Sequence, residues 1–347
     1  MWEIPEIKPL VVEHRRHRLT CACCQTSTCA ELPTGVPTHQ SGPRLVAFTA
    51  ALMGVYRQSK RRTAMFIEDI LGIPCSAGLV VKLQKLTTRS LAPCYEQLAA
   101  ALPEASAVNL DETGTKQAGR KGWIWVAATN LFTLFTVRLT RSSEVVRDLL
   151  GEGFRGAITT DRYGGYNDYQ LRQVCWAHLM RDFQSLIDAG AAGKRIGRRL
   201  QDIGHELFHH WHRARDGTIT RGTLRRNIRW LMQPMWAALE DGQRTRHAPT
   251  QAVCRDLFER FDQLWLFASH AGVEPTNNLA ERSLRHAVIW RKTSFGTQSE
   301  SGSRFVETLL TVVETCRQQD RNVLRFLEEA VTAHQHRHPA PSLLPGA

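Results

Sequence analysis

Three carboxylates have the residue type and the setting to share one metal site. Asp111 ends the apolar run Ala-Val-Asn-Leu, Asp161 ends the run Gly-Ala-Ile-Thr-Thr, and Glu281 lies far downstream in Thr-Asn-Asn-Leu-Ala-Glu-Arg. Carboxylate oxygens are the ligands that Mg²⁺ prefers. Two such ions ~3.5–4 Å apart can activate a hydroxyl and stabilise a leaving phosphate oxygen. We therefore predict that these side chains meet to cut and join DNA.

The two aspartates fall at the ends of predicted strands. Apolar runs bounded by turn residues predict five strands, with a hairpin across Asn130 and a helix capped by Ser142 or Ser143. Three strands, helix, strand, helix, strand is the order of a ribonuclease H-like α/β core, which carries acidic residues on its first strand and after its fourth. The predicted strands span residues 108–110, 123–129, 131–139, 157–160 and 171–175, and the helix runs to about residue 150.

The third carboxylate lies on a helix predicted to begin near Thr276. Asn277, Asn278, Glu281 and Arg285 recur every three or four residues, so they would share a face able to meet phosphate. The alternative is a solvated face with an exposed Glu281–Arg285 ion pair. The prediction therefore depends mainly on the order of the two aspartates along the strands.

Residues 175–178, Cys-Trp-Ala-His, straddle the fifth strand and the next helix. Cys175 and His178 could bind a metal, but two soft ligands fall short of a closed zinc site. We favour an accessory role in which they position the carboxylates. The neighbouring tryptophans are predicted to pack in the core or on the hairpin: Trp123, Trp125 and Trp176.

The distribution of charge favours an anionic partner. The net charge is +12 and the pI about 9.6. Residues 103–182 hold ten basic and nine acidic side chains, whereas residues 1–102 hold twelve against seven and residues 183–260 fourteen against eight. A near-neutral stretch between basic regions suits a metal-dependent site that receives nucleic acid.

Membrane and disulfide-bonded classes are disfavoured. No apolar run approaches the ~20 residues of a membrane span, and the N-terminus has no signal-peptide pattern. We expect a cytoplasmic, nucleoid-associated protein. Five of the nine cysteines are isolated in sequence and are predicted to be reduced, buried thiols: Cys75, Cys94, Cys175, Cys254 and Cys316.

Residues 1–40 contain half of a possible zinc site. Cys21 and Cys24 have C-x-x-C spacing, but a closed site needs four ligands and the chain has no second such pair. One alternative is a leftover half-site, and another is a start codon inside a longer reading frame. Nearby side chains that could complete the site are His14, His17, Cys23 and Cys29.

Residues 41–102 are predicted to form three helices, at about 44–58, 61–71 and 76–90, after a linker at 33–43. A glycine at 72 and an N-cap at Ser76 give the layout of a helix-turn-helix. An ordinary helical hairpin is the alternative. Basic side chains favour DNA binding, and the candidates on the third helix are Lys82 and Lys85.

The catalytic domain is expected to span residues 103–330. A helical insertion at about 184–272 separates the fifth strand from the helix carrying Glu281. A final helix is predicted at about 303–333, and residues 331–347 are predicted to be a disordered tail.

Four segments together resemble the transposases of the insertion sequence 66 family, from about residue 14 to 330. They are Leu-Asp-Glu-Thr-Gly at 110–114, Thr-Asp-Arg-Tyr-Gly-Gly-Tyr at 160–166, Cys-Trp-Ala-His-Leu-Met-Arg-Asp-Phe at 175–183, and Asn-Asn-Leu-Ala-Glu-Arg-Ser-Leu-Arg with Trp-Arg-Lys at 277–292. The resemblance implies a DDE-type enzyme dependent on Mg²⁺ or Mn²⁺, with two ions and the triad Asp111, Asp161 and Glu281.

The resemblance also implies partners and a missing segment. It implies double-stranded DNA, both terminal inverted repeats and target, bound by a dimer or larger synaptic complex, with accessory element-encoded proteins and no membrane. Family members begin earlier, and Cys21 with Cys24 match the second cysteine pair of their zinc domain. Candidate backbone contacts, which would give affinity rather than sequence choice, are Arg282, Arg285, Arg291 and Lys292.

Three other functions remain open from the sequence. A metal-dependent nuclease of the same fold would cut DNA without joining it. A truncated or decayed transposase would bind DNA without catalysis. A structural helical protein with incidental acids would not show salt-dependent DNA binding.

Overall fold

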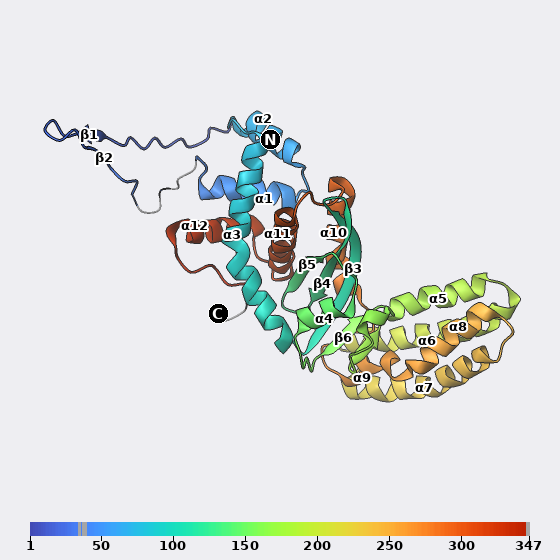
Figure 1. Ribbon diagram of the computed structural model, residues 1–347. Coiled ribbons are helices and arrows are strands. Elements are labelled where there is room, and N and C mark those ends of the chain that lie inside the picture. Colours follow the sequence, from blue (N-terminus) through green and yellow to red (C-terminus); the bar gives the residue numbers. More distant parts are fainter. Residues whose placement is uncertain (34–35, 37–39, 345–347) are drawn as a thin grey trace.

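The computed structural model describes residues 1–33, 36 and 40–344. It is a mixed α/β structure in which a twisted sheet lies between a group of N- and C-terminal helices and a separate helical bundle (Figure 1). A small hairpin of β1 (Arg18–Thr20) and β2 (Ser27–Cys29) extends away from the rest (Figure 1). No described helix is both long enough and apolar enough to cross a membrane.

The central sheet has the strand order β5-β4-β3-β6-β7. β3, β4 and β5 pair antiparallel, whereas β6 and β7 run parallel to β3. The predicted hairpin is confirmed, and all five predicted strands are present. Their bounds are β3 (Ala107–Gln117), β4 (Arg120–Ala128), β5 (Thr133–Arg138), β6 (Ala157–Thr160) and β7 (Arg172–Val174).

The first strand is much longer than its apolar run predicts. β3 continues through Gln117 because it pairs with β4 around a tight turn at Ala118 and Gly119, which have φ of 49° and 77°. Glycine adopts positive φ without steric cost. The polar second half of β3 therefore gains its strand conformation from its partner rather than from a hydrophobic pattern of its own.

Helix α11 (Glu300–Gln318) closes one edge of the sheet. Glu307, Thr311 and Thr315 are four residues apart, and their side-chain oxygens accept hydrogen bonds of 2.8, 2.9 and 3.2 Å from the β5 amides of residues 137, 135 and 133. An uncovered edge strand would offer these amides to another chain. Polar side chains in the middle of an otherwise buried helix are explained by this contact.

Three helices precede the sheet, as predicted: α1 (Pro43–Gly54), α2 (Lys60–Leu71) and α3 (Ala77–Ala101). Gly72 ends α2 in the left-handed region at φ 62°, and the Ser76 hydroxyl accepts from the Leu79 amide at 3.1 Å to begin α3. α3 ends eleven residues later than predicted, because Leu91, Cys94 and Leu98 in its second half are buried in the main core. α3 also contacts α11 and α12 (Val323–His336).

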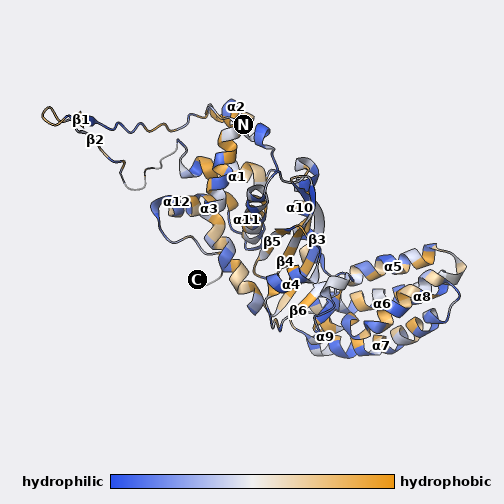
Figure 2. Ribbon diagram, in the orientation of Figure 1, coloured by the Kyte–Doolittle hydropathy of each residue, from blue (hydrophilic) through white to orange (hydrophobic). Residues whose placement is uncertain are grey.

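The predicted helical insertion is a bundle with its own hydrophobic core. Figure 2 shows apolar and polar colours alternating along these helices, as expected for helices that bury one face. The helices are α5 (Trp176–Asp188), α6 (Ala191–Arg215), α7 (Arg221–Gln243), α8 (Ala248–Glu259) and α9 (Leu266–Ser269). The helix predicted after the third strand is α4 (Ser143–Leu150), and the helix carrying Glu281 is α10 (Asn278–Ser294).

Two predictions at the C-terminus are wrong. The predicted helix at 303–333 is two helices, because Asn322 caps a new helix by accepting from the Arg325 amide at 2.9 Å. The predicted disordered tail is ordered through residue 344. Leu343 is fully buried and its carbonyl accepts from Gln319 at 2.7 Å, so apolar burial offsets the cost of ordering the tail. Residues 345–347, and 34–35 and 37–39 of the predicted linker, lie outside the described residues.

Candidate carboxylate site

The register of the parallel strands places two predicted site residues side by side. Asn109 of β3 lies opposite Thr159 of β6. The same register continued by two residues brings Asp111 next to Asp161, which directly follows β6. The chain therefore holds two carboxylates at neighbouring positions of the sheet. Asp161 directly follows its strand as predicted, whereas Asp111 lies inside β3 rather than at its end, because pairing with β4 continues the strand to Gln117.

Asn277 fixes the start of the helix that supplies the third carboxylate. Its side-chain amide donates to the Leu110 carbonyl at 2.8 Å, and its amide oxygen accepts from Asn109 at 3.2 Å. Asn277 is fully buried, so both bonds are shielded from water. Glu281 lies in the first turn of α10, and the hydrogen bonds of Asn277 to β3 hold that turn against the sheet.

Electrostatic repulsion links Asp111 to the other two carboxylates, although the group of described ligand atoms within 4.8 Å of one another does not include these three together. Burial raises the pKa of Asp111 to about 7, and the negative charges of Glu112, Asp161 and Glu281 add to that rise, while a hydrogen bond from the Glu112 amide at 2.9 Å opposes it. An acid this perturbed binds its proton near neutral pH. A divalent cation would offset the same repulsion, and carboxylates are the donors such a hard ion prefers. The residues therefore fit Mg²⁺ or Mn²⁺.

Glu112 is a buried carboxylate that the sequence analysis did not single out. Alternation along β3 turns it to the face opposite Asp111. There it accepts from Arg141 at 2.7 Å and from the Tyr166 hydroxyl at 2.5 Å. Burial raises its pKa, and these two donors oppose the rise. Arg141 also lies 3.9 Å from the centre of the Tyr163 ring, so Glu112 anchors a basic side chain beside the site.

Arg172 holds the loop that carries Asp161. Its side chain is nearly inaccessible, and its guanidinium donates to the carbonyls of Asp161 at 2.7 Å and Tyr163 at 3.1 Å and to the Thr160 hydroxyl at 2.9 Å. The Asp161 carboxylate accepts from the Tyr163 amide at 2.8 Å. A planar donor array of this kind fixes several acceptors at once, so Arg172 sets the direction of the Asp161 side chain.

Cys175 and His178 meet Glu281 rather than the aspartates. The Cys175 thiol lies 3.9 Å from Glu281 Oε1, and His178 Nε2 lies 3.5 Å from the same oxygen. The alternative Glu281–Arg285 ion pair is not formed among the described residues, where the ionic neighbour of Glu281 is His178. This contact agrees with the predicted accessory position of the two residues.

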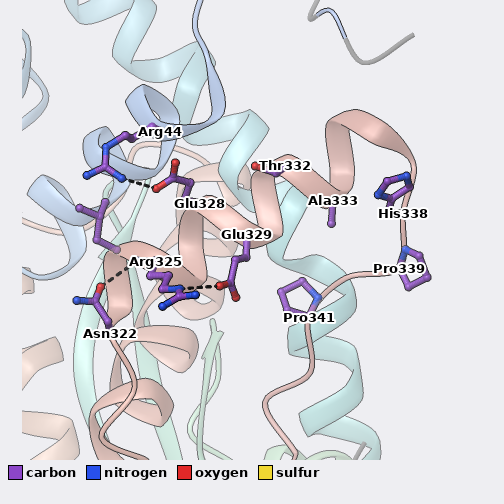
Figure 3. A pocket seen from close by; sticks show the side chains of 11 residues that line it. Arg44, Asn322, Arg325, Glu328, Glu329, Thr332, Ala333, His338, Pro339 and Pro341 are labelled. Atoms are coloured by element: carbon purple, nitrogen blue, oxygen red, sulfur yellow. Dashed lines mark hydrogen bonds and ion pairs between the residues drawn. The ribbon is translucent and has the colours of Figure 1, made fainter. Parts of the chain in front are cut away.

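A shallow hollow of about 300 Å³ opens beside the carboxylates, lined by Asp161 and His178 among others. A larger hollow of about 840 Å³ lies between α1, α12 and the tail, where Arg44 pairs with Glu328 and Arg325 with Glu329 (Figure 3). Its charged groups neutralise one another. Of these two hollows, the smaller one has the lining residues that could take part in chemistry.

The remaining predicted residues are distributed along two helices. Lys82 and Lys85 are exposed on α3. Asn278 is exposed at the start of α10, so the buried amide that contacts β3 is its neighbour Asn277. The four basic candidates follow Glu281 along α10; Arg291 is half-buried and the other three are exposed: Arg282, Arg285 and Lys292.

The cysteine pair at the N-terminus lies in the exposed β1–β2 hairpin. The hydroxyl of Thr26, 3.3 Å from Cys24, lowers the pKa of that thiol to about 7, and Cys21 contributes a weaker hydrogen bond. Within the described residues, the cluster of three metal-ligating side chains lies at Cys175 instead. Zinc binding at Cys21 and Cys24 stays a prediction.

Two of the three tryptophan predictions can be judged from burial. Trp125 and Trp176 are completely buried, as expected for core residues. Trp123 is half-buried on the hairpin, with Lys121 5.1 Å and Arg141 4.9 Å from its ring centre.

Fold and site together define a mixed α/β protein with a carboxylate cluster beside an inserted helical bundle. The chain belongs to the IS66 family of transposases, whose sequence profile matches residues 39–304. The predicted resemblance is thereby confirmed.

Two curated relatives come from Sinorhizobium fredii (strain NBRC 101917 / NGR234). The uncharacterized protein y4qI is 23% identical over 353 residues, which cover 90% of this chain and 62% of the relative. The uncharacterized protein y4hP is 23% identical over an alignment of 371 residues, gaps included, that covers 96% of this chain and 66% of the relative. The chain thus spans slightly less than two thirds of the length of these relatives.

Proposed function

We propose that the chain is a DDE-type transposase that cleaves DNA at the ends of an insertion sequence and joins those ends to target DNA. The observation that carries the proposal is that Asp111, whose pKa burial raises to about 7, lies close enough to Asp161 and Glu281 for their charges to add to that rise. Membership of the IS66 family supports the same reaction class.

The sheet supports a ribonuclease H-like fold for the catalytic domain. Three antiparallel strands are followed by two parallel strands, and the first strand occupies the centre of the sheet. The acidic residues lie on that strand and directly after the fourth, as the resemblance implies. Residues 103–330 are our proposed catalytic domain, with the helical bundle as its insertion.

Asp111, Asp161 and Glu281 would hold two Mg²⁺ or Mn²⁺ ions. When bound, the metal would supply the Lewis acidity that makes water or a 3′-hydroxyl nucleophilic and stabilises the leaving oxygen. The chain's own residues provide the frame. Asn277 holds the start of the Glu281 helix against β3, and Arg172 holds the loop of Asp161.

Basic side chains would position the DNA backbone. Arg282, Arg285, Arg291 and Lys292 extend from Glu281 along α10, so a duplex at the carboxylates would pass beside them. We propose α2 and α3 as a helix-turn-helix-like unit, with Lys82 and Lys85 exposed on its second helix. Joining two DNA ends requires both in one complex, so we propose a dimer or larger assembly.

The test is a strand-cleavage and joining assay on labelled DNA carrying the terminal repeats of the encoding element, with Mg²⁺ or Mn²⁺. We expect joined products from the wild-type chain and none from Asp161→Asn or Glu281→Gln, because loss of metal ligation removes several kcal/mol of transition-state stabilisation, about 10³-fold in rate. Glu274→Gln, an exposed acid before α10, is the matched control.

The other outcomes separate the rival functions. Cleavage without joining would identify a nuclease of the same fold. Salt-dependent binding with no cleavage, equal in wild type and variants, would identify a DNA-binding protein without catalysis. Absence of salt-dependent DNA binding would contradict all three DNA functions.

A further inference from the structure

A cysteine, a histidine and a glutamate converge next to the proposed Mg²⁺ site. One ligand atom from each of Cys175, His178 and Glu281 lies within 4.8 Å of the other two. Cys175 is fully buried, whereas the side chains of His178 and Glu281 are each 30% exposed. The cluster is therefore enclosed on the thiol side and reachable from solvent on the other.

Backbone contacts hold the three side chains in place. Cys175 precedes α5, and His178 follows one helical turn later, so both face the same side. The Asn277 amide donates to Cys175 Sγ at 3.2 Å, and the Trp176 amide donates to the Pro275 carbonyl at 2.9 Å. The segment before α10 is thus tied directly to the start of α5, and the ligand atoms do not depend on flexible loops.

The donor set differs in kind from the carboxylates beside it. Thiolate and imidazole nitrogen are soft or borderline ligands that suit zinc-class ions, whereas Mg²⁺ prefers oxygen. Three protein ligands from sulfur, nitrogen and oxygen leave a fourth tetrahedral position open, the arrangement of zinc sites that bind water or substrate. The hollow lined by Asp161 and His178 provides access to that position.

An unsatisfied atom points to the same conclusion. His178 Nδ1 is buried and has no hydrogen-bond partner among the described residues. Leaving a buried polar atom unpaired costs about 1–3 kcal/mol, and a bound cation would satisfy a neutral imidazole nitrogen. The other ring nitrogen, Nε2, lies 3.5 Å from Glu281 Oε1.

We propose that Cys175, His178 and Glu281 bind one zinc-class divalent ion, at a site distinct from the Asp111–Asp161 pair. Binding replaces the Cys175 thiol proton, which passes to solvent. Glu281 contributes Oε1, the oxygen that faces both partners, and keeps its second oxygen for the carboxylate site. The ion fixes the orientation of Glu281 and makes it a shared ligand. Metal binding here does not require that the chain join DNA.

Cobalt titration of the full chain tests the proposal, because a Co²⁺–thiolate bond gives a near-ultraviolet charge-transfer band. The test uses a background in which Cys21, Cys23, Cys24 and Cys29 are all replaced by Ser, so that the exposed hairpin cannot contribute thiolates. We expect one Co²⁺ per chain with a thiolate band, displaced by one equivalent of Zn²⁺ and retained in a large excess of Mg²⁺, which prefers oxygen ligands.

Two variants and one control define the ligands. Cys175→Ser should abolish the thiolate band, and His178→Gln should weaken Co²⁺ binding by about 100-fold or more, since loss even of an outer-shell partner costs 10–100-fold. Cys254→Ser, another fully buried cysteine but in the helical bundle, should bind Co²⁺ as the background does. Circular dichroism establishes that each variant is folded.

The proposal is overturned if the folded background shows no thiolate band, or if the band survives Cys175→Ser. It is also overturned if Asp111→Asn removes the band, because the cluster would then be part of the Mg²⁺ site. Failure of DNA joining with the band intact contradicts the proposed function alone. Loss of the band with joining intact contradicts the metal site alone.

Discussion

Two hydrophobic cores of different origin meet at the carboxylate site. The first combines the sheet with α1–α3 and α10–α12, segments from both ends of the chain. The second is built mainly by α5–α9, which follow one another in sequence, and it also includes Ala157 of β6 and Val174 of β7. Trp125 is completely buried in the first, edge-on to Tyr166 at 6.4 Å, and Trp176 is completely buried in the second, 5.4 Å from Trp265.

The difference shows how the site tolerates a large insertion. The bundle leaves the sheet at Trp176 and the chain returns at Pro275, and the backbones of these two residues share a 2.9 Å hydrogen bond. Entry and exit therefore lie side by side. Asp111 and Glu281 both belong to elements of the first core, so the bundle can change without moving them, provided that this junction holds.

The sharpest test removes one tryptophan from each core. Trp125→Ala and Trp176→Ala should each cost about 3–5 kcal/mol of unfolding free energy, but in different regions. Hydrogen exchange should show lost amide protection in β3–β5 and α11 for the first variant, and in α5–α9 for the second. Equal loss of protection throughout both variants would mean that the two cores unfold as one unit.

The next largest effect concerns the repulsion inside the first core. Because the pKa of Asp111 is raised from 3.8 to about 7 in the folded chain, the folded state holds a proton that the unfolded state has released. Stability should therefore fall as pH rises through this window, by at most about 4 kcal/mol and less in practice because Asp111 is only partly buried.

Urea unfolding at pH 5 and pH 8 without divalent ions measures that fall. Asp111→Asn should reduce it, whereas Glu274→Gln should leave it unchanged. If the unfolding free energy changes by the same amount between pH 5 and pH 8 in the wild type and in Asp111→Asn, then the pKa of Asp111 is not raised in the folded chain.

Two adjacent asparagines test the contact between the start of α10 and β3. Asn277→Ala removes the bond to the Leu110 carbonyl and leaves Asn109 with its longer, 3.4 Å bond to the Thr276 carbonyl, so we expect a loss of about 1–3 kcal/mol and reduced DNA joining. Asn278→Ala, at an exposed position, should stay within about 0.5 kcal/mol of wild type. Similar effects of both substitutions would contradict the proposal that the hydrogen bonds of Asn277 to β3 hold α10 in place.

The smallest effect on stability is expected on α3. Lys82→Gln with Lys85→Gln should change unfolding by less than about 0.5 kcal/mol. It should weaken DNA binding and reduce the slope of log K against log salt by about 2, near 0.9 per lost phosphate contact.

The control for α3 is Arg44→Gln with Arg325→Gln, which removes the same charge from side chains already paired with glutamates. An equal change in salt slope for both double variants would show that only total charge matters. It would contradict a DNA contact at Lys82 and Lys85.

The sequence by itself determined the elements whose signals are local. The strand at 157–160 and the helix at 143–150 have the predicted bounds, because a hydrophobic run acts within a few residues. Ser142 precedes that helix, but its hydroxyl makes no capping bond among the described residues. Ser76 caps α3 as predicted. The order of the two apolar runs predicted that the aspartates would be neighbours, and the parallel register of β3 and β6 agrees, although β3 continues past Asp111 to Gln117.

The tertiary structure alone decided the partners of the polar residues. Asn277 and Asn278 are identical in type and adjacent, yet only Asn277 is buried, because the docking of α10 on β3 selects it. Glu112 and Arg172 have ordinary sequence surroundings, and their burial follows from contacts with Arg141 and with the Asp161 loop. Which carboxylate meets which donor depends on packing between segments that are distant in sequence. The hydrophobic periodicity of a single segment does not determine that packing.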